Sequence, residues 1–320
     1  MSLETYIGKM SRLRVATAAG RASPHKICML LAVFDLARSG ALTENRIRYE
    51  PALLERYHRY FEAVRAPGDH PNPYFPFFHL RGSLTDKTPS FWHLHPFEGR
   101  ESVVAAMDTA RSPRNIIDNI AWATLDDELF ALLQYEETLE ALAQALATRW
   151  FDRGLQDLAS VVEQGRRISR YEQSIRGLMI GAADVRDMPA TVRNPAFRRV
   201  VTEKYDYRCA ATGVRILLPD GTAMVEAAHI HPFSEGADDD PRNGLALTPD
   251  MHWAMDKHLI APGPDFKWHV SKVVDDRIPD FRLLSGLNGR RLFLPDEQRF
   301  YPKQDVLAWR LENMRKQYLD

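Results

Sequence analysis

Apolar residues recur at helical spacing in several segments of this chain. The segment after Ser23 and Pro24 runs as KICMLLAVFDLAR to Gly40, with apolar residues repeating every three or four positions. Because proline suits the first turn of a helix, we predict that a buried amphipathic helix begins there. Further helices are predicted from Pro51, from Ser112-Pro113, over Glu136–Phe151 and over Gln304–Gln317.

Two short aromatic runs lie between these helical segments. PNPYFPFFHLRG and FWHLHPF are separated by a polar turn segment, a pattern that predicts a β-hairpin. Helices and hairpin together predict an N-terminal α+β domain over residues 1–160. A chain of 320 residues is long enough for a second domain. We place that domain at 196–320, after a basic, helix-containing linker over 161–195 that ends in MPATVRNP.

The charges are distributed unevenly along the chain, although the net charge is −1. Acidic residues dominate the stretch 126–163, and basic residues dominate the stretch 166–208. A basic zone inside a neutral protein is compatible with local phosphate contact, and solvated helix faces carry such runs as well. Charge alone therefore leaves a nucleic-acid partner open.

Cysteine content and hydropathy argue against several classes of protein. Cys28 and Cys209 are the two cysteines and lie far apart, which argues against a disulfide framework and against a four-cysteine zinc site. The sequence has no run of about 18 apolar residues that would predict a membrane span, and its start lacks the apolar core of a signal peptide. We expect a reduced, cytoplasmic protein without a membrane partner.

The segment VEAAHIHPFSEGADDDPRNGLALTPDMHWAMDKHLI has the most informative pattern. Small and β-branched residues predict a strand over Met224–Phe233, followed by a polar loop. A helix capped by Thr248, with Pro249 at its first position, comes next. An earlier strand is predicted around Cys209–Leu218. The predicted order is therefore strand, strand, helix.

Four side chains in this segment have the chemistry of phosphodiester hydrolysis. The reaction needs a base that deprotonates water and a cation that stabilises charge on the phosphate. His229 suits the first task because the unperturbed pKa of histidine is near 6.5. His252 and Asp256 lie four positions apart on the predicted helix, so both project from one face and are candidate ligands for one divalent ion. Asn243 would orient the His229 imidazole or complete the coordination shell.

This segment resembles the HNH endonuclease family, in the branch written E-A-A-H-I, N-G-L and H-x-x-x-D. The resemblance covers about residues 196–270 and implies a ββα-metal fold. It also implies that His229 is the general base and that His252 is a ligand of magnesium or manganese. The matching residues are Glu226-Ala227-Ala228-His229-Ile230, Pro232, Asn243-Gly244-Leu245, His252 and Asp256.

The chain departs from many members of that family at two places. Ala228 stands where they carry an aspartate or histidine that binds the metal. Glu226 lies two residues back on the same strand face and is the candidate substitute, binding directly or through water. Cys209 alone replaces the paired CxxC zinc ribbons of other members. A core without zinc must therefore hold this fold together.

The remaining polar residues of the segment have simpler interpretations. His231 is interpreted as a neighbour of the base rather than the base itself. Asp238, Asp239 and Asp240 do not continue into a calcium-binding loop pattern and are interpreted as a solvated turn. His258 is interpreted as structural.

The first 155 residues carry a second resemblance. SPHKICMLLAVFDL, YFPFFHLRG and FWHLHPF resemble the sulfur-recognising domain of modification-dependent (type IV) restriction endonucleases. That resemblance implies binding of phosphorothioated DNA in an apolar pocket beside basic side chains, at a helix start that favours anions. The candidate DNA-binding residues are His25, Lys26, Tyr74, Phe75, Pro76, and, alternating on one strand face, His79 and Arg81.

Other interpretations of this first region stay open. The aromatic residues of the two runs are by default core residues. Three histidines, His79, His93 and His95, would form a small metal site if they met across the hairpin. Recognition of a methylated base would instead require a deep aromatic pocket.

The sequence thus predicts a modified-DNA recognition domain followed by an HNH endonuclease that cuts double-stranded DNA near the mark. Because one ββα unit supplies one active centre, a homodimer is expected for cutting both strands. Two alternatives remain: an HNH nuclease without modification dependence, such as a nicking enzyme or a toxin, and a DNA-binding regulator with a decayed nuclease core.

Overall fold

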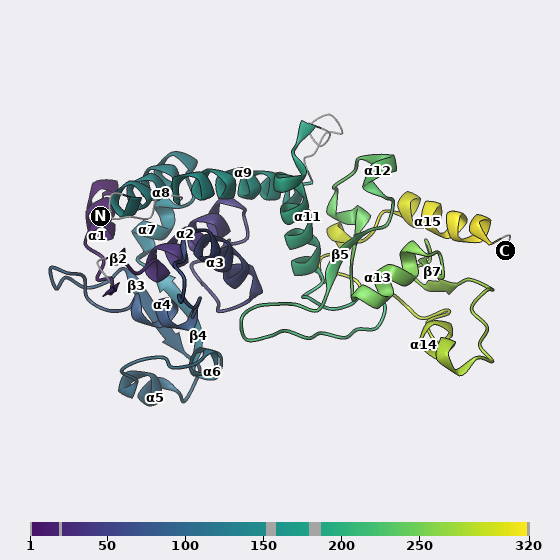
Figure 1. The fold of residues 1–320 in the computed structure, drawn as a ribbon, viewed down its shortest axis with the longest axis horizontal. Helices are drawn as coiled ribbons and strands as arrows, with labels where there is room; N and C mark the ends of the chain where they lie inside the picture. Colours follow the sequence, from purple (N-terminus) through teal and green to yellow (C-terminus); the bar gives the residue numbers. More distant parts are fainter. Residues whose placement is uncertain (1, 19–20, 152–157, 179–186, 319–320) are drawn as a thin grey trace. The chain divides into compact units, whose positions relative to one another are not determined.

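The structure is a computed structural model that describes residues 2–18, 21–151, 158–178 and 187–318. The chain divides into two compact units (Figure 1). The first unit comprises Met1–Gln173 with Pro219–Thr222, and the second comprises Ser174–Leu218 with Ala223–Asp320. None of the described helices has both the length and the apolar character that a membrane span requires.

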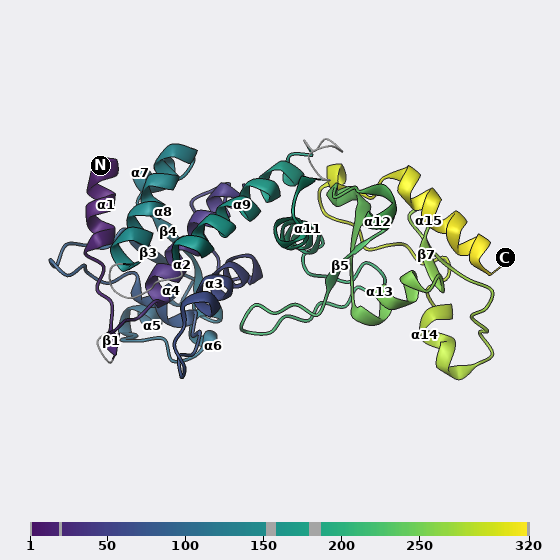
Figure 2. The ribbon, with the colours of Figure 1, turned by 45° about the horizontal axis from the view of Figure 1, so that its top comes forward.

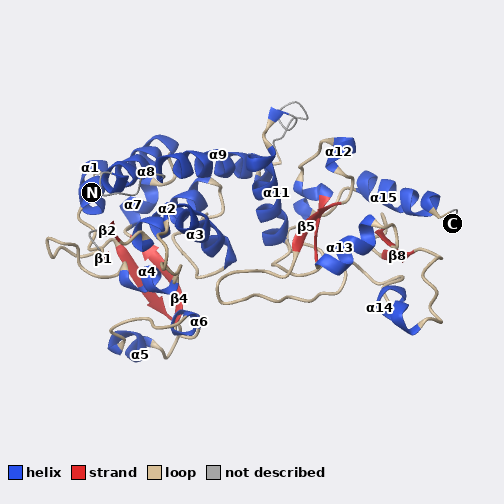
Figure 3. Ribbon diagram, in the orientation of Figure 1, coloured by secondary structure: helices blue, strands red, loops and turns tan. Residues whose placement is uncertain are grey.

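The first unit is mostly helical, with two small antiparallel strand pairs (Figure 3). Its strands are β1 (Thr17–Ala18), β2 (Arg21–Ala22), β3 (Trp92–Pro96) and β4 (Ile120–Leu125). Its helices are α1 (Leu3–Ser11), α2 (His25–Arg38), α3 (Pro51–Val64), α4 (Tyr74–His79), α5 (Glu101–Ala106), α6 (Pro113–Ile117), α7 (Asp127–Leu132) and α8 (Glu136–Phe151). Helix α9 (Leu158–Arg176) begins in this unit.

Helix α2 forms the centre of the first unit. It is buried on nearly all sides from Ile27 to Leu36 and packs against α3, α4 and α8. The predicted helices at Pro24, Pro51, Ser112-Pro113 and Glu136–Phe151 are confirmed. At the third of these, Ser112 and Asn115 form a capping box, which satisfies free backbone donors at the helix start.

The predicted hairpin between the two aromatic runs is wrong. Residues 74–79 form helix α4, and the second run, β3, pairs with β4 in the register Trp92↔Leu125 to Pro96↔Ile120. Tyr74, Phe77 and Phe78 follow the helical spacing i, i+3, i+4, and burial of both phenylalanines favours the helix. Prolines within this run also lack the N–H groups that a strand ladder needs.

The second unit is α+β and is built from short elements. Its strands are β5 (Glu226–His229), β6 (Gly244–Leu247), β7 (Ile260–Pro262) and β8 (Trp268–Val270). Its helices are α11 (Ala190–Lys204), α12 (Phe233–Gly236), α13 (Pro249–Asp256), α14 (Arg282–Ser285) and α15 (Gln304–Gln317), with short 3-10 turns η1 (Pro241–Asn243), η2 (Pro279–Phe281) and η3 (Gln298–Phe300). Helix α15, as predicted from the sequence, packs against β7 (Figure 2).

The strand–strand–helix motif consists of β5, β6 and α13. Strands β5 and β6 pair in antiparallel fashion from Glu226↔Leu247 to His229↔Gly244, and α13 follows β6 directly. The strand predicted at 209–218 is wrong: Cys209 and Gly213 close a tight turn there, and Ala210 donates one backbone hydrogen bond to Ala246. Gly213 has φ of +75°, which favours a turn over a strand.

The segment between the predicted domains is partly described. Of the predicted linker 161–195, residues 179–186 lie outside the described residues. Helix α11 continues through Pro195 to Lys204. The assignment of residues 1–160, 161–195 and 196–320 as recognition domain, linker and nuclease domain stays a prediction.

Candidate active site

Strand β6 and the start of α13 form the scaffold of the candidate site. All four residues of β6 are buried, and α13 packs against both β5 and β6. Thr248 precedes the helix with extended backbone, and Pro249 occupies its first turn. Ala228 is fully buried in β5, so small side chains let the strand pack closely under the helix. This packing places side chains from β5 and α13 near each other.

The His229 imidazole is fixed at the end of β5 by contacts on its face and its edge. The ring of Phe197, from α11, stacks on it with a centroid separation of 3.9 Å and an interplanar angle of 2°. Its Nε2 atom lies 3.0 Å from Oδ1 of Asp239. The side chain stays 22% exposed, so solvent reaches it. A histidine held in this way is suited to accept a proton from a water molecule.

Asp239 is buried, which corrects the interpretation of the three aspartates as a solvated turn. Its side chain has no solvent exposure and accepts hydrogen bonds from Arg193 of α11 at 3.0 and 3.2 Å. The Arg193 guanidinium in turn lies over the Phe233 ring, 3.3 Å from its centroid. Sequence reasoning missed Asp239 because the run Asp238–Asp240 has the composition of an exposed turn, and only burial distinguishes its middle member.

The two flanking aspartates stabilise the loop. Asp238 and Asp240 each form an ion pair with Lys303, at 2.9 and 3.0 Å. Burial acts to raise the pKa of Asp240, but hydrogen bonds from Arg242 and the Lys303 charge outweigh it, so that pKa is lowered. The loop is therefore held at both sides of Asp239.

Asn243 is fully buried, and its amide binds backbone atoms. Oδ1 accepts from the N–H of His231 at 2.9 Å, and Nδ2 donates to the carbonyls of His231 and Asp238 at 3.0 Å each. These bonds join the end of β5 to the loop that carries Asp239. The predicted contact with the His229 imidazole is not among them; Asn243 is placed to act through the loop instead.

His252 lies between the two carboxylates that were predicted to share a metal with it. Its Nδ1 is 2.7 Å from Glu226 Oε1, and its Nε2 is 3.5 Å from Asp256 Oδ2. Because the carboxylates are on opposite ring nitrogens, the three side chains do not converge on one point. No group of three or more metal-binding side chains occurs among the described residues.

The donor set nevertheless fits one divalent ion held by two protein side chains. His252 Nε2 and Asp256 Oδ2 are adjacent and come from the same helix face. Glu226 accepts the other imidazole N–H, which is the usual arrangement around a metal-binding histidine. Glu226 therefore fits a supporting role better than direct ligation. Arg310 also donates to Asp256 at 3.1 Å, so a cation bound there would compete with this ion pair.

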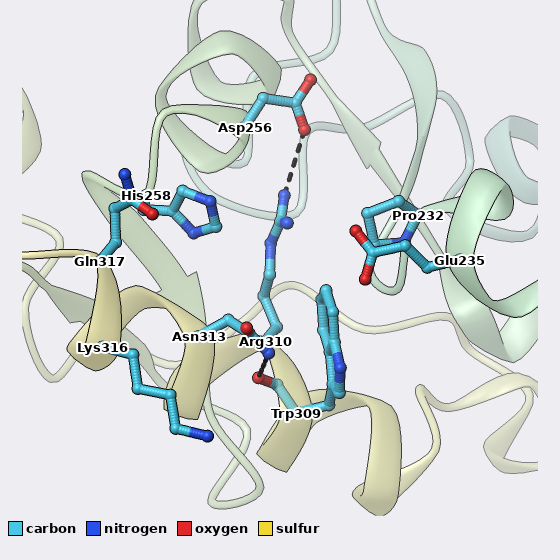
Figure 4. A pocket seen from close by; sticks show the side chains of 9 residues that line it. All are labelled: Pro232, Glu235, Asp256, His258, Trp309, Arg310, Asn313, Lys316 and Gln317. Carbon is cyan, nitrogen blue, oxygen red and sulfur yellow. Dashed lines mark hydrogen bonds and ion pairs between the residues drawn. The ribbon is translucent and has the colours of Figure 1, made fainter.

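A pocket of about 460 Å³ opens beside Asp256 (Figure 4). In Figure 4 the buried Arg310 extends from α15 toward Asp256, with His258 on one side and Trp309 on the other. Burial lowers the pKa of both Arg310 and His258, against the charge of Asp256. The full lining is Pro232, Glu235, Asp256, His258, Trp309, Arg310, Asn313, Lys316 and Gln317. Sequence reasoning did not find the α15 residues, which lie far from Asp256 along the chain.

His231 lies beside the pocket rather than at the base position. Its backbone N–H is bonded to Asn243, and its ring contacts Trp309 at a centroid separation of 4.1 Å. This placement agrees with its interpretation as a neighbour of the base.

The predicted DNA-binding residues of the first unit lie on α2 and α4, two helices that pack together. His25 donates from Nε2 to the His70 carbonyl at 3.0 Å, so its Nδ1 accepts from the Ser23 hydroxyl. Lys26 donates to the Arg14 carbonyl at 2.9 Å. Burial, then the Arg14 charge, lowers the Lys26 pKa to about 8. The His25 ring thus has internal partners on both nitrogens.

The α4 candidates form a mixed apolar and basic surface. Phe75 is 43% exposed, Tyr74 is half-buried, and Pro76 is buried. His79 is not on a strand but ends α4, where its ring contacts Phe75 and its Nε2 bonds Thr109. Burial, then the charges of Lys26 and Arg81, lowers the His79 pKa. Arg81 donates to two backbone carbonyls, of Val104 and Met107. These contacts bring Lys26, Phe75, His79 and Arg81 into one neighbourhood.

The histidines of the proposed hairpin metal site have separate partners. His79 bonds Thr109, His93 bonds Asp126, and His95 bonds Thr124. The structure therefore gives this alternative no support.

Among curated proteins, none matches this chain. A solved structure described as "Modification dependent TagI restriction endonuclease" is similar over 40% of this chain and 39% of that chain, with 22% identity and a TM-score of 0.29. The match spans well under half of either chain and carries no conclusion about fold or activity.

The family match falls on the motif described above. The family HNH endonuclease matches residues 209–261, which contain β5, the Asp239 loop, β6 and α13. This range includes the histidine at the end of β5 and the histidine on α13. Residues 209–261 are therefore an HNH endonuclease domain, the domain of a phosphodiester hydrolase.

Proposed function

We propose that the protein is a metal-dependent DNA endonuclease in which His229 is the general base. The observation that carries this proposal is the fixed imidazole of His229, stacked on Phe197 and hydrogen-bonded to Asp239, in the motif that matches the family. A base must be held in one orientation to deprotonate a water molecule aligned with the phosphate.

The other residues of the motif have supporting roles in this proposal. His252 and Asp256 would hold one divalent ion, magnesium or manganese, and Glu226 would orient His252. Such an ion stabilises negative charge that builds up on the phosphate. His229 takes one proton from water, the resulting hydroxide forms the new P–O bond, and the bond to the leaving oxygen breaks. The leaving oxygen takes its proton from solvent.

We further propose that the first unit directs this activity to phosphorothioated DNA. The support is the surface where the exposed Phe75 ring lies in one neighbourhood with the Lys26, His79 and Arg81 side chains. Sulfur is softer and less strongly hydrated than oxygen, so an apolar ring favours it, while cations attract the remaining phosphates. Cutting both strands requires two active centres, and we propose that two copies of the chain supply them.

Cleavage of matched duplexes tests the proposal. One duplex carries phosphorothioate and the other is plain, and each is incubated with magnesium, manganese or chelator. We expect metal-dependent cleavage of the modified duplex alone, and none by His229→Ala, which should still bind DNA. Equal cleavage of both duplexes would keep the nuclease and remove the sulfur specificity. Full activity of His229→Ala would remove His229 as the base.

A further inference from the structure

Asp239 is a buried carboxylate in direct contact with the proposed base. We propose that Asp239 is a positioning residue that fixes His229 in the tautomer with its proton on Nε2, so that Nδ1 accepts the proton from water. This inference rests on the proposed role of His229 as general base. It identifies the atom of His229 that accepts the proton and the residue that selects this atom.

The Asp239 carboxylate is an acceptor for a cationic side chain. Arg193 donates to both oxygens, at 3.0 and 3.2 Å, and the Asp239 side chain has no solvent exposure. An ionised carboxylate has no proton to give and can only accept a hydrogen bond. The 3.0 Å contact with His229 therefore requires a proton on Nε2. In the neutral imidazole the lone pair is then on Nδ1.

Two aromatic rings lie beside the His229 imidazole. Phe197 is parallel to it at 3.9 Å, and Phe233 lies at 6.1 Å with an interplanar angle of 59°. Phe233 is itself covered by the Arg193 guanidinium. A half-turn of the imidazole about its Cβ–Cγ bond would put the carbon Cε1 in the place of Nε2, and the hydrogen bond to Asp239 would be lost. The charged groups that these contacts bring to the imidazole are Asp239 from the loop and Arg193 from α11.

The same carboxylate favours the product of proton transfer. When Nδ1 takes the proton from water, the imidazole becomes a cation, and the anionic Asp239 stabilises that cation through the existing hydrogen bond. No atom has to move for this interaction to strengthen. The stabilisation is therefore larger in the transition state than in the resting site, which raises the rate rather than the affinity.

The substitution Asp239→Asn removes the negative charge beside His229. Oδ1 of Asp239 accepts both the nearer Arg193 bond and the His229 bond, each at 3.0 Å, so the oxygen of the new side-chain amide takes the place of Oδ1 and keeps both. Nε2 then keeps its proton, and the imidazolium loses the anion that stabilises it. A hydrogen bond to a charged group contributes about 1.5–3 kcal/mol, so for Asp239→Asn we expect a loss in kcat of about 10- to 10²-fold with KM unchanged.

Nitrogen NMR of the full chain tests the tautomer without any need for cleavage. The chain is labelled with ¹⁵N-histidine, and the His229 signals are identified by their disappearance in His229→Gln. We expect a protonated Nε2 and an unprotonated Nδ1 in the metal-free protein near pH 8. The opposite tautomer, or an equal mixture of the two, overturns the inference even if His229→Gln is inactive.

Kinetics with a matched pair of variants completes the test. Asp238→Asn is the control, because Asp238 is next in sequence and pairs with Lys303 rather than with His229. We expect Asp238→Asn to cleave like the parent, and we expect Asp239→Asn to lose kcat while its NMR spectrum keeps the parent tautomer. Parent-like kcat in Asp239→Asn, with His229→Gln inactive, overturns the role of Asp239 alone. Activity in His229→Gln overturns the proposed function as well.

Discussion

Replacing Asn243 by alanine tests whether this side chain acts on the backbone or on the reaction. The side chain is fully buried and makes three hydrogen bonds, one with the His231 N–H and two with the carbonyls of His231 and Asp238. A hydrogen bond contributes about 1 kcal/mol net, and each buried group left without a partner costs about 1–3 kcal/mol. We expect Asn243→Ala to lower the free energy of unfolding of the second unit by about 3–5 kcal/mol.

That loss is large compared with the total stability of a domain, which is about 5–15 kcal/mol. In a domain of this size each kcal/mol moves the midpoint of thermal unfolding by roughly 2–4 °C. We therefore expect calorimetry of the full chain to show the transition of the second unit lowered by roughly 10 °C. Asn313→Ala is the matched control, because Asn313 is half-buried and donates to a single carbonyl, of Trp309.

Unfolding and cleavage by Asn243→Ala together distinguish the two roles. If Asn243→Ala unfolds at the parent temperature yet no longer cleaves DNA, Asn243 acts on the imidazole or the metal ion, as the sequence alone predicted. If it unfolds early and also binds DNA normally at low temperature, the backbone contacts explain the residue.

Four further predictions concern the metal ion, the core and the recognition surface. His252→Ala is expected to abolish cleavage at every manganese concentration, since a proposed ligand is lost; activity restored by excess manganese would contradict ligation. Arg56→Met is expected to cost about 3–5 kcal/mol in urea unfolding because it leaves the fully buried Glu172 carboxylate without Arg56; an unchanged midpoint would argue against this. Binding of modified DNA should weaken between pH 7 and 9, because Lys26, with a pKa of about 8, loses its charge as pH rises; Lys26→Gln should lack that dependence in a titration by fluorescence anisotropy. Phe75→Ala should reduce the preference for the phosphorothioated over the plain duplex without changing the unfolding midpoint, since Phe75 is 43% exposed; a retained preference would remove the ring from recognition.

The sequence predicted helices correctly where it has both a residue that favours a helix start and apolar residues at helical spacing. Pro24, Pro51 and Pro249 precede or begin helices at the predicted places, because a proline in the first turn loses no hydrogen bond. The strand predicted for residues 74–79 was wrong because the pattern there is ambiguous. Its apolar residues are dense enough to fit the period of a helix and that of a strand, and the packing of α4 against α2, with the prolines of the run, favours the helix.

The sequence predicted the family of the HNH domain but not the contacts of its side chains. The spacing of His229, Asn243 and His252 identifies the motif, because these positions are fixed by β5, η1 and α13. The roles of individual side chains depend on what lies above and below them. The Asn243 amide binds backbone atoms, and Glu226 contacts Nδ1 of His252 rather than the nitrogen that faces Asp256. The spacing of residues in the sequence does not predict either contact.

The contacts of Asp239 could not be predicted from the sequence motif, because some of its partners lie outside that motif. Arg193, which donates to Asp239, and Phe197, which stacks on His229, are one turn apart on α11, more than 30 positions before His229 and more than 40 before Asp239 in the sequence. Their spacing of four places both on one helix face, and that face packs against β5. A motif confined to 209–261 cannot include them, although Arg193 holds the carboxylate that we propose selects the free nitrogen of His229. The proposed chemistry of this site is therefore divided between the family motif and a helix outside it, and substitution of Arg193 should lower kcat as substitution of Asp239 does.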